Sequence, residues 1–61
     1  MLERFEEIFE EVMDEMDLPW WEVFDSEKFG IVETRIAEEF GEAVFDSKEY
    51  CDWTYEMAMD L

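Results

Sequence analysis

One stretch constrains the fold of this 61-residue chain more than any other: residues 2–17, LERFEEIFEEVMDEMD. Apolar side chains recur there at the i, i+3, i+4, i+7 spacing that places them on one face of a helix. Carboxylates fill the opposite face, and Arg4 is its one cation. The pattern predicts an amphipathic helix over residues 2–16. Its apolar residues are Leu2, Phe5, Ile8, Phe9, Val12, Met13 and Met16, and the acidic residues of the stretch are Glu3, Glu6, Glu7, Glu10, Glu11, Asp14, Glu15 and Asp17.

The second half of the chain contains an internal echo. The segment VFDS at residues 23–26 returns as VFDS at residues 44–47, and the apolar positions that follow match in a helical stripe. In both copies the Asp-Ser pair supplies oxygens for a helix N-cap, and the preceding Phe is placed as a hydrophobic staple. The echo therefore predicts helices at about 27–40 and 48–60, the first of which ends at Gly41.

Shorter helical pieces are expected between these helices. Pro19 fits the first turn of a helix, and Asp17 is placed to cap it, so we expect a short helical turn near 19–24. Another is expected near 42–45. The whole chain, residues 1–61, is then one all-α domain: a small three-helix bundle with a short extra helical turn. A competing interpretation makes residues 29–36 a strand, because GIV and Thr34 favour extended structure locally.

The charge balance is extreme. Twenty Asp and Glu face four Lys and Arg, which gives a net charge of −16, while 49% of the residues are hydrophobic. That is too apolar for a disordered acidic tail. Like charges four residues apart destabilise a helix by about 0.2–0.5 kcal/mol per pair. We therefore expect folding to raise the pKa of these carboxyl groups, so that mild acid stabilises the fold.

Several classes of function are excluded or disfavoured. The chain has no His and one cysteine, Cys51, so it can build neither a His-based catalytic triad nor a structural zinc site. It also lacks a calcium-binding loop motif. We expect no enzyme activity, no cofactor and no metal. No signal peptide opens the chain and no apolar run approaches the ~18 residues of a membrane span, so we expect a cytoplasmic protein.

The acidic face is the strongest indication of a binding partner. It repels nucleic acid and anionic membranes, and it attracts basic surfaces. Trp20 and Trp21 are adjacent, so on a helix they point about 100° apart. Either one of them is in the core and the other is partly exposed as an interface anchor, or both belong to an aromatic-rich core. The predicted partner-binding residues are Glu3, Glu7, Glu10, Glu11, Asp14, Glu15, Trp20 and Trp21.

A second apolar row runs along the last predicted helix. Cys51, Tyr55 and Met59 recur at i, i+4, i+8, beside the main stripe of that helix. We expect this row to be buried within the bundle. The alternative is a surface for a partner, including a homodimer through the same three residues.

In size and acidity the chain resembles small phage proteins that imitate DNA and block host nucleases, repair enzymes or CRISPR effectors. The resemblance is one of composition and covers no motif. It implies a stoichiometric inhibitor of anti-CRISPR or anti-restriction type, which binds a basic, nucleic-acid-binding host protein. Carboxylates four residues apart on a helix rise by about 6 Å. Two staggered rows of them would present phosphate-like charge to a basic groove, since DNA carries one charge per ~1.7 Å.

Two further hypotheses come from other functional classes. The chain could act as an antitoxin or immunity-type protein that covers a basic toxin. The third hypothesis is a self-associating structural module whose charge only keeps it soluble.

Overall fold

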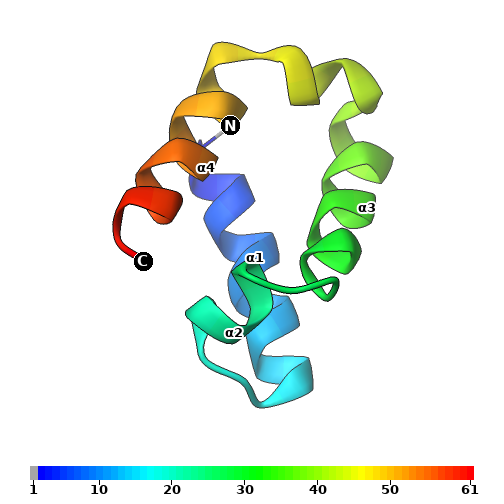
Figure 1. The fold of residues 1–61 in the computed structure, drawn as a ribbon. Coiled ribbons are helices and arrows are strands. Elements are labelled where there is room, and N and C mark those ends of the chain that lie inside the picture. The colour runs from blue at the N-terminus through cyan, green and yellow to red at the C-terminus, as the bar shows by residue number, and fades with distance from the viewer. Residues whose placement is uncertain (1) are drawn as a thin grey trace.

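Residues 2–61 are described by a computed structural model, and within them every regular element is a helix (Figure 1). The predicted all-α bundle with an extra helical turn is confirmed. The strand interpretation of residues 29–36 is wrong, because a helix runs through that segment. The elements are α1 (Leu2–Met16), α2 (Trp20–Phe24), α3 (Phe29–Phe40), the 3₁₀ helix η1 (Glu42–Asp46) and α4 (Lys48–Met59).

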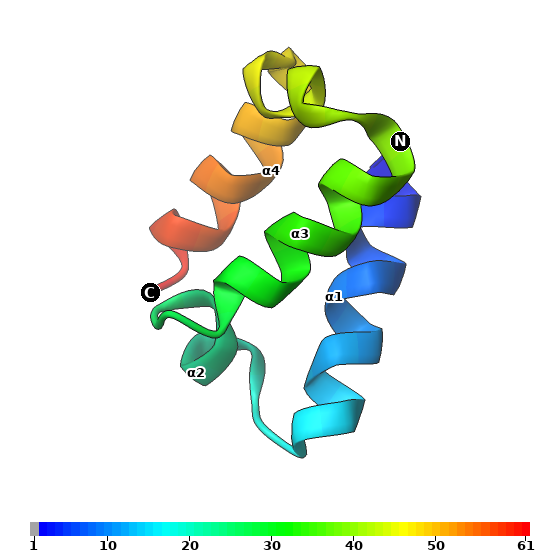
Figure 2. The ribbon, with the colours of Figure 1, turned by 90° about the vertical axis from the view of Figure 1, so that its right-hand side faces the viewer.

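The core lies where α1, α3 and α4 converge, and Phe5 is at its centre. The Phe5 side chain is fully buried. Its ring lies 5.4 Å from that of Phe40, 5.7 Å from that of Tyr50 and 5.3 Å from that of Trp53, between ring centroids. Figure 2 shows α3 crossing α1, with α4 on the other side. The buried core residues are Phe5, Ile8, Phe9, Val12, Val23, Val32, Ile36, Val44, Tyr50 and Trp53.

The first helix ends in a way that the sequence did not reveal. Asp17 has a positive φ of 55°, and the N–H of Leu18 donates to the carbonyl of Met13 at 3.2 Å. This is the hydrogen bond of a Schellman C-cap, with Asp17 in the left-handed position. The prediction that Asp17 caps the next helix is therefore wrong. Pro19 occupies the N-cap position of α2, and no side chain caps that helix.

The echo produces two different helix entrances. The Ser47 hydroxyl accepts from the N–H of Tyr50 at 3.2 Å, so it caps α4 as predicted. The Ser26 hydroxyl accepts from the N–H of Lys28 at 3.2 Å, before α3 begins, and it donates to the carbonyl of Glu22 at 2.7 Å. The second bond connects the turn to α2. The N-cap of α3 is Lys28, without a side-chain hydrogen bond, and α3 starts two residues later than predicted.

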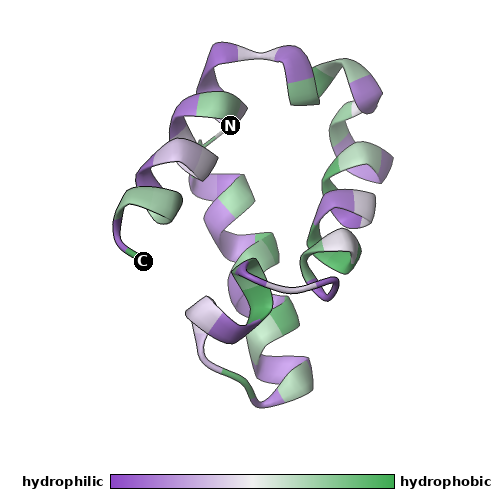
Figure 3. Cartoon of the chain, in the orientation of Figure 1, coloured by the Kyte–Doolittle hydropathy of each residue, from purple (hydrophilic) through white to green (hydrophobic). Residues whose placement is uncertain are grey.

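The second apolar row of α4 faces away from the core. Tyr50 and Trp53 are buried, whereas Cys51, Tyr55 and Met59 are exposed, the last two at 66% and 69%. The expectation that this row is buried within the bundle is wrong. Among residues 2–61 no element covers that side of α4, and α1 and α3 pack on the other side. Figure 3 shows the alternation of polar and apolar residues along the helices.

No helix within residues 2–61 combines the length and the apolar character needed to cross a membrane.

Candidate partner-binding surface

The acidic face of α1 lies on the outside of the bundle. This follows from the helix period, because the buried residues Phe5, Ile8, Phe9 and Val12 occupy the opposite face. All six predicted acidic partner-binding residues of α1 are exposed. They are Glu3, Glu7, Glu10, Glu11, Asp14 and Glu15.

The flank of this face that lies toward α3 is bound to arginines. The guanidinium of Arg4 donates from Nε to both oxygens of Glu39, at 2.8 and 2.9 Å. Its Nη1 lies 3.3 Å from Glu7 and 3.8 Å from Glu11. The partner of Arg4 that is most distant in sequence is Glu39, and this pair connects α1 to α3.

A second arginine makes the reverse connection. Arg35 on α3 donates to Glu15 on α1 through both terminal nitrogens, and the Nη2–Oε1 distance is 2.8 Å. Bidentate pairs of this kind are the strong form of an exposed ion pair. We call the three carboxylates on this side the arginine-paired flank, namely Glu7, Glu11 and Glu15.

These contacts alter the expected proton affinities. The hydrogen bond from Arg35 lowers the pKa of Glu15, and the hydrogen bond from Arg4 lowers the pKa of Glu39. For these two groups the expectation of a raised pKa is wrong, because each has a cationic partner from the facing helix. Their contribution to stability is therefore present at neutral pH and is lost in acid.

The other side of the acidic face has no such partners. Its exposed carboxylates follow one line along α1 at spacings of three and four residues, and no ion pair joins them to any residue within 2–61. We call this line the acidic stripe. The two staggered rows expected from the sequence are thus reduced to one uncompensated row. The acidic stripe consists of Glu3, Glu6, Glu10 and Asp14.

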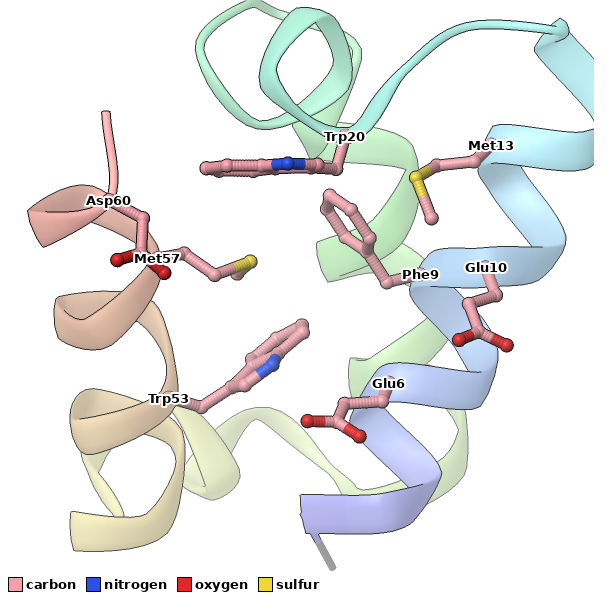
Figure 4. Close-up of a pocket in the computed structure, with 8 residues that line it drawn as sticks. All are labelled: Glu6, Phe9, Glu10, Met13, Trp20, Trp53, Met57 and Asp60. Carbon is pink, nitrogen blue, oxygen red and sulfur yellow. The ribbon is translucent and has the colours of Figure 1, made fainter.

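The acidic stripe borders an apolar hollow between α1, α2 and α4 (Figure 4). The hollow has a volume of about 260 Å³. Its walls are aromatic and thioether side chains, and its rim carries carboxylates from both sides. The lining residues are Glu6, Phe9, Glu10, Met13, Trp20, Trp53, Met57 and Asp60.

The two adjacent tryptophans have different environments, so the alternative that both belong to the core is wrong. Trp20 is half-buried, packs against the core and lines the apolar hollow. Trp21 is 52% exposed, and its ring meets that of Trp20 edge-on at 6.0 Å between centroids. Trp21 is therefore the exposed aromatic of the pair, and Trp20 is the one that lies beside the acidic stripe.

Sequence reasoning missed most residues of the hollow as site residues. Glu6 and Met13 lie on α1, and the helix period places them on one flank, but nothing in the sequence indicates which helix packs there. Trp53 and Met57 lie on the apolar stripe of α4, and such a stripe indicates core positions and not a site. Asp60 follows α4 and carries no local signal. The hollow depends on how α2 and α4 dock against α1.

The remaining chemistry of the described residues is limited. Among residues 2–61, no three His, Cys, Asp or Glu side chains gather in a way that could hold a metal ion. The phenol of Tyr50 donates to Glu33 at 3.1 Å. Burial raises the pKa of Tyr50, and the charge of Glu33 raises it further. This bond joins α3 to α4 inside the bundle.

Comparisons with known proteins find no family model, no curated protein and no solved structure that matches the chain.

Proposed function

We propose that this protein is a stoichiometric inhibitor that binds a basic, nucleic-acid-binding protein through α1. The observation that carries the proposal is the acidic stripe: four exposed carboxylates in line, without a cation from the described chain beside them. Glu15 and Glu39 each have an arginine partner, whereas the four carboxylates of the stripe lie in line on one helix face without one. Uncompensated charge of one sign speeds encounter with a surface of the opposite sign.

The stripe resembles a nucleic-acid strand in the sign of its charges and in their arrangement along one line. From Glu3 to Asp14 it extends over about 16 Å of helix, at 1.5 Å per residue. Its charges are about 5 Å apart, which is sparser than the ~3.4 Å per charge of one DNA strand. The protein would therefore bind where a nucleic-acid backbone binds, as an anti-CRISPR or anti-restriction protein would. An antitoxin that covers a basic toxin would use the same surface.

The test is retention and displacement of a partner. The chain is immobilised, a bacterial host lysate is passed over it at low salt, and duplex DNA is then added. The proposal predicts that a basic protein is retained and that DNA displaces it. Retention that DNA does not affect would contradict imitation of nucleic acid, and it would favour the antitoxin function.

A matched pair of variants locates the surface. Glu3→Lys/Glu10→Lys/Asp14→Lys reverses the acidic stripe and should abolish retention. Glu27→Lys/Glu42→Lys/Asp46→Lys changes the net charge equally on exposed residues outside α1, and it should retain the partner with only a modest loss. Equal losses in the two variants would show that net charge alone, without a specific face, holds the partner.

A second candidate function is self-association through α4. It is favoured by the exposure of Cys51, Tyr55 and Met59, which form an apolar row on the outside of the bundle. Against it, two copies would each bring a net charge of −16. Sedimentation equilibrium of the wild type and of Tyr55→Ser/Met59→Ser decides between them. A dimer that the double variant dissociates would support self-association, and a monomer at all concentrations would exclude it.

A further inference from the structure

The apolar hollow has the size of a site for one side chain. Drug-sized ligands occupy pockets of about 300–1,000 Å³, and the hollow measures about 260 Å³. It is also open at the rim, where the carboxylates lie. A small organic molecule would be poorly enclosed, whereas a side chain projecting from another protein can enter from the rim.

The walls of the hollow suit a long apolar stem. Figure 4 shows Trp20 at one end and Trp53 at the other, with Phe9 and Met57 between them on opposite sides. Aromatic faces and thioethers contact methylene groups well, and the face of a tryptophan also attracts a cation. Lys and Arg side chains combine these two properties, since they bury their stems and keep their charged heads near water.

The rim of the hollow requires a positive charge at the head of that side chain. Glu6 and Glu10 lie on the α1 side of the hollow and Asp60 lies beyond α4, as Figure 4 shows. No ion pair joins these three carboxylates to a cation within the described residues. A planar guanidinium stacks on an aromatic ring and binds carboxylates with two parallel hydrogen bonds, which a lysine ammonium cannot do.

We propose that the apolar hollow binds an arginine side chain of the basic partner, with its stem between Trp20 and Trp53 and its guanidinium at Glu6 and Glu10. This proposal rests on the proposed function, and it deepens it by naming the residue that the partner inserts. The acidic stripe then attracts the partner, and the hollow anchors it. The partner is not a second copy of this chain, because Arg4 and Arg35 are held by Glu39 and Glu15.

Hexa-arginine and hexa-lysine peptides test the proposal, because they carry equal charge and differ in the head group. Binding to the full chain is measured by calorimetry at low salt. Hexa-arginine should bind about threefold more tightly or better, in line with the extra cation–π and bidentate contacts. In methyl NMR spectra, the methionine signals of Met13 and Met57 should shift with hexa-arginine, while that of Met59, outside the hollow, should not.

Two variants of equal charge separate the hollow from the stripe. Glu6→Gln/Glu10→Gln removes two carboxylates from the rim. Glu3→Gln/Asp14→Asn removes two from the same stripe outside the hollow. All four positions are exposed, so circular dichroism should show an unchanged fold for both. The rim variant should bind hexa-arginine at least about fivefold more weakly than the stripe variant does.

The outcomes distinguish the two proposals. Equal affinity for the two peptides, with unmoved Met13 and Met57 signals, would overturn the arginine site and leave the acidic surface as a partner site. Failure of both peptides to bind at low salt would overturn the proposed function as well. A preference for hexa-arginine that the stripe variant removes and the rim variant keeps would place the arginine outside the hollow and overturn the site.

Discussion

The two flanks of α1 carry the same type of residue at similar exposure, and they have different neighbours. Toward α3, Glu15 receives two hydrogen bonds from Arg35, and Glu7 lies beside Arg4. Toward α4, Glu6 and Glu10 border an apolar hollow and have no cation partner within the described residues. One flank uses its charge to hold two helices together, and the other directs its charge outward.

This difference shows that a run of carboxylates on one helix is not one functional unit. The composition suggests a uniform acidic surface, but the fold divides it. The acidic stripe is the part of the α1 surface that the fold leaves without a cation partner among residues 2–61.

Removing the side chain at the centre of the core should unfold the domain, and both flanks of α1 should lose their arrangement with it. Phe5 is fully buried and contacts rings from α3 and α4, so Phe5→Ala should cost about 3–5 kcal/mol of unfolding free energy. A domain of this size has about 3–9 kcal/mol in total. Urea unfolding followed by circular dichroism should find the variant largely unfolded, whereas Leu2→Ala, at an exposed position, should resemble the wild type. A Phe5→Ala variant within 1 kcal/mol of the wild type would contradict this core.

Removing the arginines should destabilise the fold by breaking the ion pairs between α1 and α3. Arg4→Gln/Arg35→Gln leaves Glu15 and Glu39 without their partners, and the melting temperature should fall at low salt. Lys28→Gln/Lys48→Gln removes the same charge from lysines that form no ion pair within residues 2–61, and it should change the melting temperature much less. Added salt should reduce the difference between the two double variants. Equal losses would mean that the arginines act through net charge alone.

Acid should weaken the two arginine pairs, because the arginines lower the pKa values of Glu15 and Glu39. A group whose pKa is lower in the folded state adds stability above its unfolded pKa, here 4.5, and the stability is lost as the pH falls through the folded value. The stability difference between the wild type and Glu15→Gln/Glu39→Gln should therefore stay constant from pH 7 to 5 and shrink below pH 4.5. Melting curves across this range provide the measurement. A difference that persists at pH 2 would contradict the ion-pair account.

The helices could be predicted from the sequence because their signals are local. The spacing of Phe5, Ile8 and Val12 fixes the buried face of α1, and the Ser47 cap fixes the start of α4. The wrong prediction for Asp17 also concerns a local signal. Asp can cap the start of a helix, or it can adopt the left-handed conformation that ends one. In this chain Asp17 ends α1, and the N–H of Leu18 donates to the carbonyl of Met13 there.

The division of the acidic face could not be predicted, because it is not local. Arg4 and Glu39 are 35 residues apart, and Arg35 and Glu15 are 20 apart. Their pairing depends on the way α3 crosses α1. The exposure of the row of Cys51, Tyr55 and Met59 could not be predicted for the same reason. A periodic pattern shows that a row is apolar, but it does not show whether another helix covers that row.

The most direct test of the division compares the same substitution on the two flanks. Glu10→Gln removes a carboxylate that lies four residues from Glu6 and from Asp14, so it relieves two like-charge pairs of about 0.2–0.5 kcal/mol each. Glu15→Gln removes the partner of Arg35. At pH 7 and low salt, the melting temperature should rise or stay constant for Glu10→Gln and should fall for Glu15→Gln. Changes of the same sign and size in the two variants would contradict the division of α1 into a flank that holds the fold and a flank that is free for a partner.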